Sequence, residues 1–102
     1  MIVWHHGRCS KSRGALELLR GSGVEPTIRL YLEDPPTRDE LAWVLERVDV
    51  PLTRPDYRGS QDRDAVLDAL VRDPSLIERP VVISGDRAVV ARPPERVREL
   101  LD

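Results

Sequence analysis

A strand–helix–strand pattern in the first third of the chain does most to limit the folds that this sequence can adopt. The apolar run 2–4 predicts a short buried strand, and the leucine-rich stretch after Cys9 predicts a helix. Residues 27–32 alternate polar and apolar side chains, which predicts a second strand. Two strands joined through a helix are expected to be parallel, with a right-handed crossover.

Residues of about 37–74 predict a helical insertion between this unit and the rest of the sheet. Thr37 and Glu40 have the spacing of a capping box, in which each side chain satisfies a backbone amide at the start of a helix. The apolar residues that follow with helical spacing are Leu41, Val44, Leu45 and Val48. A second helix is expected over 64–72, with an apolar side formed by Val66, Leu67, Leu70 and Val71.

The C-terminal part predicts a β-hairpin and a last helix. A Gly-Asp turn separates two β-branched runs, 80–84 and 87–91, so these runs should pair antiparallel. Two prolines then open a helix whose buried side should hold Val97, Leu100 and Leu101. The expected α/β fold is a mixed four-stranded sheet flanked by helices.

Length and composition bound the size of the fold and its partners. The 102 residues, 40% hydrophobic and 33% charged, suit one globular domain over residues 1–102. The net charge of −2 disfavours a nucleic-acid partner. No apolar run approaches the roughly 20 residues that span a bilayer, and the N-terminus has no secretory pattern, so no membrane partner is expected.

Cys9 is the single cysteine, which excludes an intramolecular disulfide, a CxxC redox pair and a four-cysteine zinc site. It also favours a reducing compartment, and we expect the cytoplasm. The predicted strand end and helix start place Cys9 near unpaired amides, which lower a thiol pKa and can bind an oxyanion. The alternative is a small, inert packing residue, but the strand–loop–helix position favours a reactive thiol.

Two histidines precede Cys9. His5, at the end of the first strand, could support a Cys9 thiolate electrostatically or could simply cap the strand. His6 would point the other way and is expected at the surface. Because the chain has no further Cys or His to complete a ligand set, no metal site is expected.

Arginine supplies all but one of the 16 basic residues. A GC-rich genome would account for this bias, whereas a functional reason would be that guanidinium forks grip oxyanions. Arg79 and Arg92 flank the predicted hairpin, at element boundaries where site residues tend to project. Arg13 lies one turn into the first helix, and Arg54 and Arg58 lie in a proline-rich loop. A solvated surface position is the alternative for each of them.

Four segments of the chain also match motifs of a known family. Residues 5–13, HHGRCSKSR, are similar to H-x-x-x-C-x-x-S-R, and residues 23–41 follow G-x-E-P-x-x-x-x-Y-L-x-x-P-P-x-R-x-E-L. Residues 73–82 are similar to H-P-x-L-I-x-R-P-I-V, and residues 91–95 to C-R-P-x-E. These motifs are spread from residue 5 to residue 95, over nearly the whole length of the chain, which resembles the glutaredoxin-coupled arsenate reductases of the ArsC family.

The resemblance implies a thioredoxin-like fold with a helical insertion, and a chemistry centred on Cys9. The cysteine would attack arsenate as a thiolate, assisted by His5. Glutathione, as co-substrate, and glutaredoxin would then release arsenite, with no bound cofactor. The peptide bond between Arg79 and Pro80 would be cis.

The resemblance also assigns the substrate-binding residues. Arg79 and Arg92 would hold the oxyanion with a third arginine from the middle loop. This loop is shorter than in the family, which leaves Arg54 as the first choice for that role and Arg58 as the second. The list of expected substrate-binding residues is completed by Ser12 and Arg13 of the opening motif.

Two other functions remain open on the same fold. One is a thiol oxidoreductase with a different substrate, and the other is a non-enzymatic regulator of the Spx type. Spx regulators commonly carry CxxC, and Ser12 stands at the second cysteine position, which disfavours that function. An oxyanion reductase needs several guanidinium groups that converge on Cys9, whereas an adaptor needs none.

Overall fold

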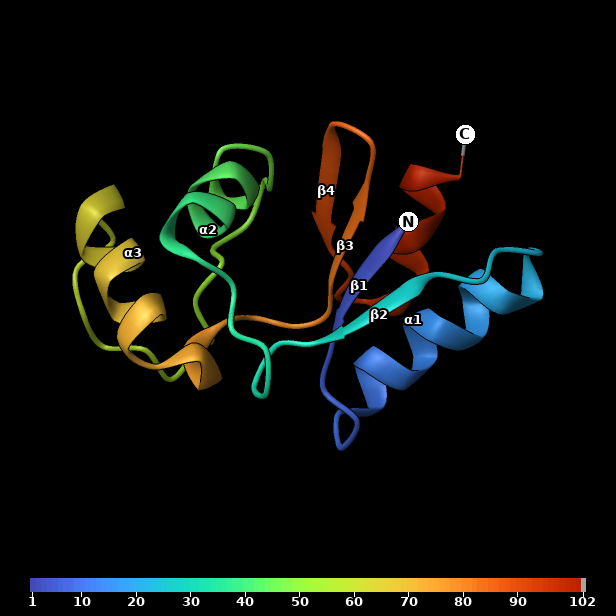
Figure 1. The fold of residues 1–102 in the computed structure, drawn as a ribbon, viewed down its shortest axis with the longest axis horizontal. Coiled ribbons are helices and arrows are strands. Elements are labelled where there is room, and N and C mark those ends of the chain that lie inside the picture. The colour runs from blue at the N-terminus through green and yellow to red at the C-terminus, as the bar shows by residue number, and fades with distance from the viewer. Residues whose placement is uncertain (102) are drawn as a thin grey trace.

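The structure, a computed structural model, describes residues 1–101 and contains one four-stranded sheet (Figure 1). Its strands are β1 (Ile2–His5), β2 (Thr27–Leu30), β3 (Val81–Ser84) and β4 (Arg87–Val90), in the order β2-β1-β3-β4. β1 is parallel to β2 and antiparallel to β3, and β3 pairs antiparallel with β4. The predicted mixed sheet, its parallel first pair and its terminal hairpin are therefore confirmed.

Helices pack against both faces of the sheet. The helices are α1 (Ser10–Gly21), α2 (Arg38–Leu45), α3 (Arg63–Arg72) and two 3-10 helices, η1 (Pro74–Leu76) and η2 (Pro94–Leu100). α1 packs on η2 at one face, whereas α2 and α3 lie together on the other side, at the left of Figure 1. Within the described residues, no helix combines the length and apolar character needed to cross a membrane.

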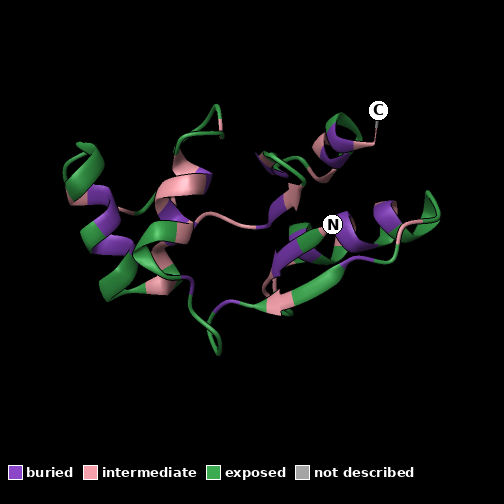
Figure 2. Cartoon of the chain, turned by 45° about the horizontal axis from the view of Figure 1, so that its top comes forward, coloured by how far each residue is buried: buried purple, intermediate pink, exposed green. Residues whose placement is uncertain are grey.

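Neighbouring residues of the central strands contribute to two different hydrophobic cores. On β1, Val3 packs into the core under α1 and η2, whereas Trp4 packs into the core with α2 and α3. Val82 and Val81 of β3 divide in the same way, because successive side chains of a strand point to opposite faces. β2, at the edge of the sheet, is exposed along most of its length (Figure 2).

Local sequence signals explain where α2 and the hairpin turn form. The Thr37 Oγ1 accepts a hydrogen bond from the Glu40 backbone N–H at 3.1 Å, and the Glu40 carboxylate accepts one from the Thr37 N–H at 2.9 Å. This is the predicted capping box. Gly85 has a φ of 60°, a left-handed conformation that glycine adopts without steric cost, and it turns β3 into β4.

The second strand and the last helix differ from the predictions. β2 ends at Leu30 instead of continuing to residue 32, because the Glu33 and Asp34 N–H groups both bond back to the Leu30 carbonyl oxygen and close a turn. The last helix is a 3-10 helix, which has three residues per turn. That geometry buries Val97 and Leu100, three residues apart, and leaves Leu101 half-buried.

Both helices of the insertion also depart from their predicted apolar sides. α2 ends at Leu45, so Val48 lies beyond it, half-buried. On α3 the buried residues are Val66, Leu67, Ala69 and Leu70. Val71 is exposed, contrary to the prediction, because at about 100° per residue it falls outside the arc that these four side chains share.

Candidate active site

Cys9 lies at the N-cap position of α1, where the loop after β1 ends. Its thiol is free and half-buried. Burial, the largest single influence, raises the pKa of Cys9, but the backbone N–H groups of Ser12 and Lys11 and the Arg79 guanidinium together lower it. The net result is a pKa below the ordinary value of a cysteine, so this thiol is predisposed to ionise.

Arg79 and Arg92 approach Cys9 from the open end of the hairpin. The register of β3 and β4 sets Val81 opposite Val90, so residues 79 and 92 meet just outside the ladder. Arg92 Nη1 lies 3.9 Å from Cys9 Sγ and donates to the Arg79 carbonyl oxygen at 3.2 Å. The Arg79–Pro80 peptide bond is cis, as expected, and so is the bond between Arg92 and Pro93.

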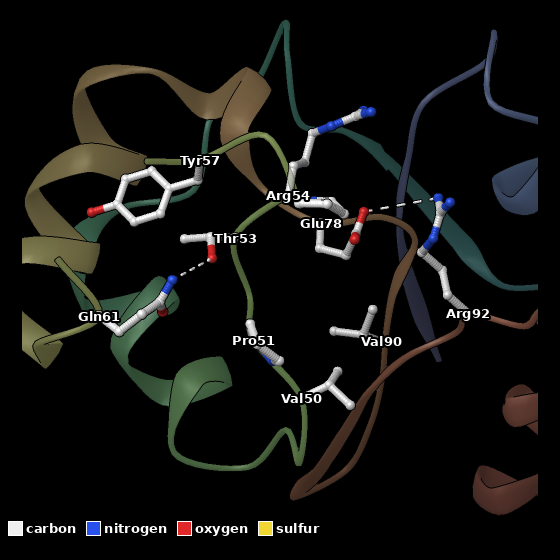
Figure 3. A pocket seen from close by; sticks show the side chains of 10 residues that line it. Val50, Pro51, Thr53, Arg54, Tyr57, Gln61, Glu78, Val90 and Arg92 are labelled. Carbon is white, nitrogen blue, oxygen red and sulfur yellow. Dashed lines mark hydrogen bonds and ion pairs between the residues drawn. The ribbon is translucent and has the colours of Figure 1, made fainter. Parts of the chain in front are cut away.

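A pocket of about 400 Å³ opens next to this pair, between the insertion and the hairpin (Figure 3). Arg92 lines one wall and Arg54 lines another, with Glu78 between them. Arg54 is paired with the exposed carboxylate of Asp56, with Nε and Oδ1 3.6 Å apart. Arg58 is exposed and is not among the lining residues. The structure thus places Arg54, the first choice from the sequence, on the pocket.

Ser12 and Arg13 contact the loop that carries Cys9. The Ser12 side chain is fully buried, and its Oγ accepts a hydrogen bond from the His6 backbone N–H at 3.3 Å. Arg13 Nη1 donates to the Gly7 carbonyl oxygen at 2.9 Å. Both side chains therefore hold residues 6–7 against α1, and neither lines the pocket that Arg54 and Arg92 share.

The two histidines lie in different surroundings. The buried Nδ1 of His5 has no hydrogen-bond partner, and burial, followed by the charges of His6, Arg13 and Arg20, lowers the pKa of His5. No hydrogen bond joins His5 to Cys9 in the described residues, so its assisting role stays a prediction. In the same part of the chain no three His, Cys, Asp or Glu side chains are grouped as a metal site requires.

His6 is half-buried, although a surface position was predicted. Its ring centroid lies 6.4 Å from that of Tyr31. Burial lowers the pKa of His6 most, and the nearby charge of Arg79 lowers it further. His6 therefore belongs to the surroundings of the arginine that approaches Cys9.

Sequence reasoning missed two residues of the site: Tyr31, which lies near Cys9, and Glu78, which contacts Arg79 and Arg92. Tyr31 is fully buried and its hydroxyl has no hydrogen-bond partner. Burial above all raises the pKa of Tyr31, against the lowering influence of the nearby Arg79 charge, and the charge of Cys9 raises it further. The Glu78 carboxylate accepts a hydrogen bond from the Arg79 backbone N–H at 3.2 Å and lies 3.8 Å from Arg92 Nη1. The position of Glu78 directly before Arg79 was the one sequence signal that could have singled it out.

The profile of the ArsC family matches residues 4–100, and the chain belongs to this family. An uncharacterized protein, YfgD of Escherichia coli (strain K12), is 36% identical over 97% of this chain and 94% of its own length. An arsenate reductase of Haemophilus influenzae is 33% identical over 99% of this chain and 98% of its own length.

The fold is also that of solved members of the family. The structure of an arsenate reductase from Vibrio cholerae superimposes with a TM-score of 0.87, at 33% identity, over 96% of this chain and 94% of that one. The predicted thioredoxin-like fold class is confirmed by this match.

Proposed function

We propose that this protein is a thiol oxidoreductase that reduces arsenate to arsenite through Cys9. The observation that carries the proposal is the convergence of Arg92 and Arg79 on the Cys9 sulfur, with Arg92 Nη1 3.9 Å from it. Guanidinium groups beside a thiol favour its ionisation and offer forked donors to a tetrahedral oxyanion. Relatives of similar length that are named arsenate reductases support the same substrate.

In the first step the Cys9 thiolate attacks the arsenic of arsenate. An S–As bond forms and one As–O bond breaks, and the departing oxygen leaves as water after protonation. Arg79 and Arg92 hold the remaining oxygens and stabilise the charge that develops on them, and Arg54 contributes from the other wall of the pocket. The assistance of the thiolate by His5 is carried by the family resemblance and is part of this proposal.

An external thiol must complete the reaction, because the chain has no second cysteine with which to form an internal disulfide. Glutathione attacks the Cys9 sulfur, the S–As bond breaks, and its electron pair remains on arsenic, which leaves as arsenite. The two sulfurs are oxidised to a mixed disulfide in the same step. Glutaredoxin then reduces that disulfide. Because the cycle depends on a free thiol, it suits a reducing compartment such as the cytoplasm.

A coupled assay tests this proposal. With glutathione, glutaredoxin and glutathione reductase supplied, we expect NADPH oxidation that depends on arsenate and on Cys9. Intact mass should rise by one glutathione when arsenate and glutathione are added together, and fall back when glutaredoxin is supplied. Turnover sustained by thioredoxin alone, with no glutathionylated protein at any time, would contradict the glutathione-coupled cycle.

A second candidate function is the reduction of a mixed disulfide on another molecule. The pocket that Arg92 shares with Arg54 favours it, because its volume of about 400 Å³ and its walls of Val50, Pro51 and Val90 can take more than an inorganic oxyanion. The same assay, with a glutathionylated peptide in place of arsenate, separates the two functions. NADPH oxidation with the peptide but not with arsenate would favour the second.

A further inference from the structure

Glu78 is a carboxylate in a site that otherwise gathers positive charge. Its side chain is only 12% exposed, and it faces the pocket between Arg54 and Arg92 (Figure 3). A part-buried carboxylate beside an anion site opposes the binding of anions, because like charges at short range repel one another more strongly where water is partly excluded.

The contacts of Arg92 show where this carboxylate acts. The Nη1 of Arg92 faces three acceptors: the Cys9 sulfur at 3.9 Å, the Arg79 carbonyl oxygen at 3.2 Å and the Glu78 carboxylate at 3.8 Å. Glu78 therefore shares the guanidinium nitrogen of Arg92 that contacts the Cys9 sulfur. An oxyanion that reaches Cys9 must compete with Glu78 for this donor.

A second contact fixes the carboxylate in place. Glu78 Oε1, the atom that faces Arg92, also accepts the Arg79 backbone N–H at 3.2 Å. Its own backbone N–H donates to the Leu52 carbonyl oxygen at 2.7 Å, which joins this segment to the insertion. The negative charge is thus held at the site by the backbone and is not a mobile surface group.

We infer that Glu78 is a specificity-determining residue that limits the charge of the anion bound beside Cys9. This inference rests on the proposed function, because it takes the space beside Cys9 and Arg92 to be an oxyanion site. The Coulomb energy between Glu78 and a bound anion is proportional to the charge of the anion. Glu78 therefore penalises a dianion more than a monoanion of the same shape.

Sulfate and perchlorate make a suitable pair of probes, because both are tetrahedral oxyanions and they carry two charges and one. Binding is measured as protection of Cys9 from alkylation by iodoacetamide, a neutral reagent, at constant ionic strength. The concentration that gives half-protection reports affinity even if a variant changes the reactivity of the free thiol. In Glu78→Gln we expect this concentration to fall about tenfold for sulfate and about threefold for perchlorate.

Two further variants control for structure and for net charge. Glu78→Asp keeps the carboxylate and should leave both affinities within about twofold of the unmodified protein. Glu17→Gln makes the same change of charge at an exposed position on α1 and should alter neither. Glu78→Gln retains an oxygen that can accept the Arg79 N–H, and circular dichroism checks that it folds.

The inference is overturned if Glu78→Gln binds sulfate no more tightly than the unmodified protein does. Weaker binding would instead make Glu78 a support that holds Arg92 in place. If Glu78→Gln raised the affinity for sulfate and for perchlorate by the same factor, the proposed dependence on the charge of the anion would be wrong. If neither anion protects Cys9 in any of these proteins, the oxyanion site itself fails, and the proposed function fails with it.

Discussion

Two regions contribute arginines to the candidate site, and the backbone holds them in different ways. Arg79 and Arg92 lie just outside the β3–β4 ladder, so the hydrogen-bonded register of two strands sets their separation. Arg54 lies in the long connection between α2 and α3. That connection meets the rest of the chain at an isolated bridge between Thr53 and Ile77, through the buried Leu52 side chain, and through an ion pair between Asp49 and Arg96.

The positions of Arg79 and Arg92 are therefore determined by regular structure. The position of Arg54 depends instead on how the insertion packs against the rest of the chain. A ladder of paired strands places residues to either side of it with little freedom, whereas a loop outside regular structure, held at separate points, can shift when its supporting helices shift. We therefore expect the hairpin side to control the chemistry at Cys9, and the insertion side to tune the binding of substrate.

The largest expected effect is the loss of Cys9, which both regions serve. Cys9→Ser should keep the fold but abolish arsenate-dependent NADPH oxidation, because an unactivated hydroxyl is a poor nucleophile at neutral pH. Circular dichroism checks the fold. Retained turnover in this variant would show that Cys9 is not the nucleophile, and the arginines of both regions would then not act on the reacting group.

The next effect compares the arginines directly. Arg79→Lys and Arg92→Lys keep the charge but remove the planar fork, and each should cost about 1–3 kcal/mol in kcat/KM for arsenate. Arg54→Lys should cost less, about 0.5–1.5 kcal/mol, and should act through KM. Arg72→Lys, at the end of α3, is the matched control. A larger loss at Arg54 than at both hairpin arginines would reverse the ranking of the two regions.

The ionisation of Cys9 sharpens the same comparison. Because the Arg79 guanidinium lowers the pKa of Cys9, Arg79→Gln should raise it, whereas Arg54→Gln should leave it unchanged. Thiolate absorbance titrated against pH measures both. The depressed pKa also stabilises the fold: the contribution is fully present above the unfolded-state pKa of about 8.5 and is lost as pH falls through the lower folded-state value. A Cys9 pKa equal to that of an unfolded peptide would contradict this account.

The regular parts of the fold could be predicted from the sequence because they depend on local patterns. The β-branched runs around Gly85 identified the hairpin, and the hairpin register in turn brings Arg79 and Arg92 together. Residues whose role depends on three-dimensional approach could not be found in this way. Tyr31 lay in an apparent strand, yet the chain turns after Leu30 and buries it near Cys9.

The type of the last helix and the position of Glu78 are two further features that the sequence could not reveal. Two prolines open the last helix, and its i to i−3 hydrogen bond, from the Arg96 N–H to the Pro93 carbonyl oxygen at 3.0 Å, is of the 3-10 type. Spacing that suits an α-helix could not distinguish the two helix types. Likewise, Glu78 was one acidic residue among 18 until the structure set it beside Arg92.

The smallest expected effect tests whether the insertion can be loosened without disturbing Cys9. Thr37→Ala removes one half of the capping box of α2 and should lower the free energy of unfolding by about 1 kcal/mol. For a domain of this size such a loss lowers the Tm by roughly 4–8 °C. Thr37→Ser keeps a hydroxyl that can accept the Glu40 N–H, so it should retain most of the stability.

In both variants the pKa of Cys9 should be unchanged, because the groups that lower this pKa lie in α1 and at Arg79. A shift of that pKa in Thr37→Ala, with the Ser variant unaffected, would show that the insertion and the hairpin act as one unit.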